Sequence, residues 1–176
     1  MDTSRQAVEA ARDSAESSRR SADEAAAVAR IEADREHHRL GPTQTTVPTS
    51  FNEPHAAGHR DLFGTIILAR DYRVRAFIEL GPNGRSEASL PAAVLRANEP
   101  YRIFIEKWPP GQTKPEASAV LLKLWPPVET DAVEHWTCRC GRPLVDSRRD
   151  DPGHWDVRLP LEDPTGPIVM QGSLIA

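Results

Sequence analysis

The chain has 176 residues, of which 22 are basic and 26 are acidic, so its formal net charge is −4 at pH 7. This length suits one domain of ordinary size with an appendage. No segment has the excess of Lys and Arg that releases counterions from phosphates, so we expect no nucleic-acid partner.

The sequence pattern shows neither a targeting signal nor a membrane-spanning segment. The first residues lack the basic stretch followed by an apolar one that marks a secretory signal. The densest apolar run, TIILA at 65–69, is far shorter than the roughly 18 residues of a membrane span. We therefore expect a cytoplasmic protein without membrane association, in which the two cysteines are thiols or metal ligands.

Residues 1–40 are predicted to form one long helix. Ala, Glu, Arg and Ser dominate this segment, and neither Gly nor Pro occurs before Gly41 and Pro42. A seven-residue repeat places small side chains along one face of this helix. Its members are Val8, Ala15, Ala22 and Ala29, with Ala11, Ser18 and Ala25 three positions later.

This seam of small residues leaves two interpretations open. Small residues permit close helix approach, which favours a coiled-coil stalk for self-association or for docking a protein partner. They also bury little apolar area per turn, which favours a solvated helix with mixed charges on its surface. His37 and His38 lie near the end of the helix and are interpreted as residues that complement its dipole, not as ligands.

Residues 41–60 are predicted to be a linker stiffened by three prolines, Pro42, Pro48 and Pro54. From residue 61 the apolar pattern changes to a period of two, as in YRVRAFIEL at 72–80. We count about eight short strands over 61–176 with turn signals between them, the spacing of an antiparallel β-sandwich or barrel. The predicted fold is therefore mainly β, an antiparallel β-sandwich preceded by one long N-terminal helix.

Four tryptophans accompany the predicted strands. Trp136 and Trp155 alternate with other apolar residues, so we expect them in the core. Trp108 and Trp125 each precede a proline pair at a strand end. We expect these two to be more exposed, either sealing an edge of the sheet or anchoring a partner.

The segment EHWTCRCGRP at 134–143 holds both cysteines, Cys138 and Cys140. If 134–140 is a strand, both thiols share one face with Trp136, while His135 points the other way. This interpretation predicts that Cys138 is buried as a small apolar residue and that no metal is required. It is the one we favour from the sequence alone.

The alternative is a zinc site. Gly141 allows the chain to turn with a positive φ and to form a knuckle. His135, Cys138, Cys140 and His154 would then offer four ligands of the types that zinc accepts. The single residue between the cysteines departs from the usual spacing of two, and no second cysteine pair is present.

Signatures of catalysis are missing from the sequence. It has no G-x-S-x-G elbow, no glycine-rich phosphate loop and no H-E-x-x-H. We therefore expect a non-enzymatic interaction or structural module, with the helix for oligomerisation or partner docking and the sandwich for binding. A sensor or enzymatic β-domain that uses a bound ligand or zinc is the alternative.

The helix exit RIEADREHHRLGP and the strand-ending WPP and WTCRCGRP segments resemble those of small uncharacterised proteins of GC-rich actinobacteria. In those proteins, a helix that ends in an R-x-x-R-H-x-x-L-x-P-like stretch precedes a β-rich body. The stretch at 35–42 departs from that spacing. The resemblance implies a fold and assigns no site residue.

Overall fold

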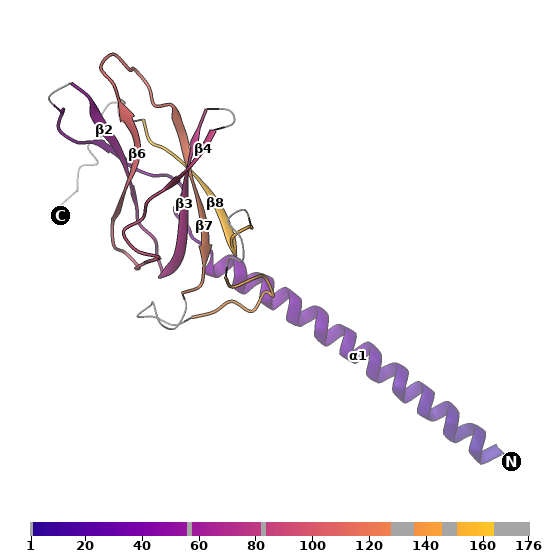
Figure 1. Ribbon diagram of the computed structural model, residues 1–176. Helices are drawn as coiled ribbons and strands as arrows, with labels where there is room; N and C mark the ends of the chain where they lie inside the picture. Colours follow the sequence, from indigo (N-terminus) through magenta and orange to yellow (C-terminus); the bar gives the residue numbers. More distant parts are fainter. Residues whose placement is uncertain (1, 56–57, 82–83, 128–135, 146–150, 164–176) are drawn as a thin grey trace, which may run out of the picture. The chain divides into compact units, whose positions relative to one another are not determined.

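The computed structural model describes residues 2–55, 58–81, 84–127, 136–145 and 151–163 (Figure 1). Its contacts divide the chain into two units. One contains residues 1–41 together with Cys138–Arg142, and the other contains 42–137 together with 143–176. The short segment Cys138–Arg142 therefore belongs to the helix unit, although the chain on both sides of it belongs to the β unit.

The helix α1 (Asp2–Leu40) confirms the predicted N-terminal helix. Oppositely charged side chains pair along its surface, Glu16 with Arg20 and Glu32 with Arg35. Every residue from position 4 to position 32 is exposed. Among the described residues, none forms a helix with the length and apolar content that crossing a bilayer requires.

The β unit contains two antiparallel sheets, as predicted for a sandwich. One sheet has the order β1-β2-β6, and the other has the order β4-β3-β7-β8 with β5 also paired to β3. The strands are β1 (Thr49–Phe51), β2 (Arg60–Ile66), β3 (Tyr72–Leu80), β4 (Gly84–Ala88), β5 (Val94–Leu95), β6 (Tyr101–Trp108), β7 (Ala117–Trp125) and β8 (Trp155–Pro160).

Alternate side chains of these strands form the core. The three-stranded sheet contributes Leu62, Ile66 and Ile103, each without exposed surface, and the five-stranded sheet contributes Leu122 and Leu124. At one end of the core, the rings of Tyr72, Trp136 and Trp155 meet with centroids 5.3 to 5.8 Å apart. Burial raises the pKa of Tyr72 to about 12, so its phenol stays neutral.

Part of the segment 41–60 contributes to this body. Its strand β1 pairs with β2, and Val47 donates a backbone hydrogen bond of 3.0 Å to Pro160. The Val47 side chain is fully buried. This segment therefore supplies both ladder hydrogen bonds and core volume.

Trp108 and Trp125 are buried, so the expectation that they are exposed is wrong. Trp108 packs edge to face on Phe51, and its indole nitrogen donates a 3.1 Å hydrogen bond to the Gln112 carbonyl. Trp125 is 1% exposed, and the Arg73 guanidinium lies 5.2 Å from its ring centroid. The prolines end these strands as expected, but the tryptophans before them turn into the protein's own packing. Their role as partner-binding residues has no support in this geometry.

Candidate metal site

The segment around the two cysteines does not form the predicted strand. Residues 136–139 have no strand hydrogen bonding, and the chain bends at Cys140. Gly141 then adopts a φ of +80°, in the left-handed region that favours glycine. The prediction of a strand over 134–140 is therefore wrong for its described part, because Cys138–Arg142 has its contacts with the helix unit instead of pairing with a strand.

This turn belongs to the helix unit, where it meets the last turn of α1. Cys138 is 5% exposed and Cys140 is half-buried, and both are free thiols. The Nδ1 atom of His37 lies 3.7 Å from the Cys138 sulfur. The candidate ligand atoms of His37, Cys138 and Cys140 all lie within 4.8 Å of one another.

These distances suit a tetrahedral metal ion. A nitrogen and a sulfur bound to zinc at about 2.0 and 2.3 Å lie about 3.5 Å apart at the tetrahedral angle. The observed nitrogen-to-sulfur distance of 3.7 Å is close to that value. This pair is therefore already near the required spacing, and ligand atoms as far as 4.8 Å apart would approach by about 1 Å on binding a common metal.

The electrostatics of Cys138 also bear on metal binding. Burial raises the pKa of the Cys138 thiol, and the charges of Cys140 and Glu36 raise it further, while a hydrogen bond from the Cys140 backbone lowers it. Two thiolates so close together repel each other unless a cation lies between them. A divalent ion would reverse this effect and favour deprotonation.

The four residues expected as zinc ligands have different outcomes. Cys138 and Cys140 lie together, and the burial predicted for Cys138 is confirmed. His135 lies outside the described residues, so its role stays a prediction. His154 belongs to the β unit, where it is fully buried and packs on Trp155 with ring centroids 4.3 Å apart.

A backbone carbonyl orients the His154 ring. Its Nδ1 lies 3.0 Å from the carbonyl oxygen of Pro143, and Pro143 follows Cys140 by three residues in the chain. An uncharged imidazole at this distance donates Nδ1–H to the carbonyl, so the ring's lone pair is on Nε2. Metal-binding histidines commonly have this arrangement.

His37 was interpreted from the sequence as a residue that complements the helix dipole and not as a ligand, whereas the structure places it beside the cysteines. The structure separates its role from that of His38, whose Nδ1 lies 2.8 Å from the Asp34 carbonyl on the exposed side of the helix. His37 is buried instead. The two adjacent histidines in EHHR, at the end of the helix, were the sequence signal for a ligand at this position. The sequence could not connect His37 with Cys138, because the two are 101 residues apart.

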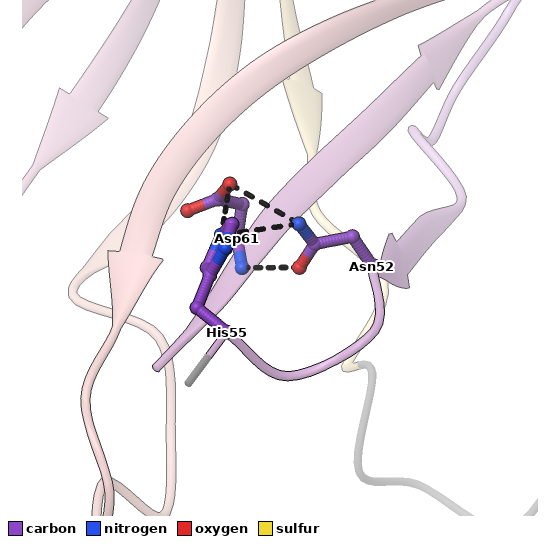
Figure 2. Close-up of polar contacts among 3 residues, drawn as sticks. All are labelled: Asn52, His55 and Asp61. Carbon is purple, nitrogen blue, oxygen red and sulfur yellow. Dashed lines mark hydrogen bonds and ion pairs between the residues drawn. The ribbon is translucent and has the colours of Figure 1, made fainter. Parts of the chain in front are cut away.

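A second polar cluster joins the two ends of the loop between β1 and β2 (Figure 2). His55 Nε2 lies 3.0 Å from Asp61 Oδ2, and Asn52 binds Asp61 through both its amide nitrogen and its amide oxygen. These side-chain hydrogen bonds stay within the trio in the described structure. In catalysis, a His–Asp pair activates a nucleophile such as a hydroxyl or a thiol that contacts the imidazole. The side-chain hydrogen bonds of His55 described here go only to Asn52 and Asp61. The cluster is therefore better explained as a set of contacts that closes the loop.

Comparison with models of protein families, with curated proteins and with solved structures found no match to this chain. Its function must therefore be inferred from the geometry.

Proposed function

We propose that this protein binds one zinc ion through His37, Cys138, Cys140 and His154, and that the ion has a structural role. The observation that carries the proposal is the convergence of one imidazole and two thiols, from positions 37, 138 and 140, within 4.8 Å. Cysteine thiolates and histidine imidazoles are common metal ligands, and zinc is the ion that most often binds both in one site.

The donor set favours zinc over harder cations. Calcium and magnesium prefer carboxylate and carbonyl oxygens, whereas the proposed ligands are sulfur and nitrogen. Four protein ligands would also leave no open position for a reacting water, which is the pattern of structural rather than catalytic zinc sites. We therefore also propose that the chain is not an enzyme at this site.

His154 is proposed as the fourth ligand on two grounds. Its Nδ1 contact with the Pro143 carbonyl leaves the lone pair on Nε2, the ring atom that can bind a metal. With the imidazole of His37 and the two thiols, the imidazole of His154 also completes a set of two cysteines and two histidines, which is a common ligand set of structural zinc. Thiolate ligation further agrees with a reducing, cytoplasmic location, which we also propose.

Metal analysis of single variants tests this proposal. We expect one equivalent of zinc in the purified protein and its loss in His37→Ala, Cys138→Ser, Cys140→Ser and His154→Ala. The matched control is His38→Ala, which removes an exposed imidazole next to His37 and should retain zinc. Replacement of zinc by Co²⁺ should give the visible absorption of a tetrahedral thiolate site.

Two results would decide against the proposal or narrow it. A protein without metal after purification and after incubation with zinc would refute a zinc site. Retention of zinc by His154→Ala, with loss in the other three variants, would show a site with three protein ligands.

We propose as a second function that α1 is a stalk for self-association or for docking a protein partner. Three β-branched side chains on α1, Val8, Val28 and Ile31, are more than half exposed, and burial of such side chains favours association. Light scattering coupled to size exclusion tests this function. A dimer or larger species that dissociates in a Val28→Glu, Ile31→Glu variant would support the stalk, and a monomer at all concentrations would exclude self-association.

A further inference from the structure

The outer face of the five-stranded sheet gathers basic side chains in a chain whose net charge is −4. The register places Arg75 of β3 opposite Lys123 of β7, and Leu121 of β7 opposite Arg158 of β8. On the other side of β3, Glu79 is opposite Arg85 of β4. Cations from four neighbouring strands therefore share one face, because paired residues point the same way.

Three of these cations surround the ring of Phe77. The Arg85 guanidinium carbon lies 4.3 Å from the ring centroid, the Arg75 carbon lies 5.4 Å away, and the Lys123 ammonium lies 5.5 Å away. Each distance is within the range of a cation–π contact. Contact with the ring therefore restrains the positions of these three cationic groups on this face.

Most of the charged neighbours are already paired. Arg75 binds Glu87 at 3.0 Å, and Arg158 binds Glu79 with its closest contact at 2.6 Å. Asp156 Oδ1 accepts a 3.0 Å hydrogen bond from the Gly153 backbone. By contrast, Arg85 has no carboxylate within salt-bridge distance among the described residues, although its charge contributes to lowering the pKa of Glu79 on the neighbouring strand.

Arg85 is exposed and forms one wall of a pocket of about 370 Å³. Lys123 and Arg158 also line this pocket, together with the acidic Asp156 and the apolar Leu121. The lining thus has three cationic side chains and one anionic side chain. A volume of this size accommodates a small ligand.

We propose that this pocket binds a multivalent oxyanion, a small molecule with phosphate or carboxylate groups. The cation–π contact with Phe77 restrains the position of the Arg85 guanidinium, which is a planar fork with five N–H donors. This fork matches two oxygens of one phosphate or carboxylate. Lys123, whose ammonium also donates a 2.6 Å hydrogen bond to the Asp151 carbonyl, adds a second positive charge, whereas the charge of Arg158 is offset by Glu79. With Arg85 and Lys123 both cationic, a ligand with at least two negative charges is favoured over a monovalent one.

Titration of the full chain with pyrophosphate and with citrate tests the proposal. Binding is measured at low salt by calorimetry and by changes in amide chemical shifts. We expect Arg85→Gln to weaken binding about tenfold and Arg85→Glu to abolish it. Arg85→Lys keeps the charge but loses the fork, so its affinity should lie between those of the original protein and Arg85→Gln. Binding should weaken as salt is added.

The matched control is Arg102→Gln. Arg102 also stacks on a phenylalanine, with its guanidinium carbon 3.8 Å from the Phe63 ring centroid, but it belongs to the other sheet. Its substitution should leave anion affinity unchanged. Binding of pyrophosphate alone would identify a phosphate ligand, and binding of citrate alone a polycarboxylate. Failure of both anions to bind at millimolar concentration, or equal weakening by Arg85→Gln and Arg102→Gln, would overturn the proposal.

Discussion

His37 and His38 are neighbours in the sequence with different environments in the structure. Successive residues of a helix point about 100° apart, so only one of the two can face the turn that holds the cysteines. His37 lies 3.7 Å from the Cys138 sulfur, while His38 contacts the Asp34 carbonyl one turn earlier. A difference of one position therefore separates a candidate ligand from an exposed residue whose ring contacts the backbone of its own helix.

The two cysteines should differ in reactivity when no metal is bound. Alkylation requires an accessible thiolate, and Cys138 is buried with a raised pKa while Cys140 is half-buried. We expect Cys140 in the chelator-treated protein to react about tenfold faster than Cys138. Peptide mass mapping after timed exposure to iodoacetamide measures both rates. Equal rates in the folded protein, as expected in the denatured control, would show that the described burial is wrong.

Glu79 provides a second residue whose environment has a measurable consequence. Its Oε2 accepts hydrogen bonds from Arg158 at 2.9 Å and from Ser118 at 3.1 Å. The bond from Arg158 is the largest cause that holds the pKa of Glu79 below its ordinary range. Since the pKa is lower in the folded chain, this pair stabilises the fold at neutral pH, and the contribution is lost as pH falls through the folded pKa.

Replacement of Arg158 by Gln should therefore reduce stability near neutral pH and have little effect in acid. Urea unfolding from about pH 7 to about pH 3 measures the difference between Arg158→Gln and the original protein, which we expect to shrink as the pH falls. The corresponding difference for Arg102→Gln, whose stacking partner Phe63 is uncharged, should stay constant. A difference for Arg158→Gln that is independent of pH would contradict the assignment.

At the scale of elements, local patterns were sufficient to predict the helix and the longer strands. The absence of Gly and Pro through Leu40 predicted the helix end, and strict alternation predicted β3, whose burial pattern begins buried, half-buried, buried. Pairing between distant segments carries no such local signal. Neither β1 within 41–60 nor the convergence of His37 on Cys138 could be predicted, because each depends on contacts across the fold.

Gly64 of β2 illustrates how closely distant segments pack. A Cβ at this position would lie 2.7 Å from Val47 Cγ1 and 2.9 Å from Ile105 Cδ1. The Ile105 atom is the end of a flexible side chain and can move, but the short branched Val47 cannot move as easily. We expect Gly64→Ala to lower the free energy of unfolding by about 1–3 kcal/mol, measured by chemical denaturation.

A double-mutant cycle identifies the cause of this effect. Val47→Ala removes the obstructing methyl groups, so Gly64→Ala should cost less in the Val47→Ala background than in the original protein. Simple additivity of the two changes would show that Val47 is not the obstacle.

At the scale of the whole molecule, the chain passes from the β unit into the helix unit and back over only five residues, Cys138–Arg142. The same helix unit is joined covalently to the β unit at Gly41 and Pro42. The helix therefore has one covalent link to the body and a second link that depends on how firmly Cys138–Arg142 is held to α1. A zinc ion bound by His37, Cys138 and Cys140 would make this second link strong, since structural zinc contributes directly to folding free energy.

Removal of zinc should consequently increase the freedom of the helix relative to the body. Probes placed at Ser17 of α1 and at the exposed Phe104 of β6 through non-thiol side-chain chemistry would report the distance distribution by fluorescence or spin resonance without modifying the cysteines. We expect a narrow distribution with zinc, a broader one after chelation and recovery when zinc is restored. The distance distribution of His37→Ala should be broad both with zinc and after chelation. The distribution of His38→Ala should respond to zinc and to chelation as that of the original protein does. A distribution that chelation leaves unchanged would show that the metal does not join the two units.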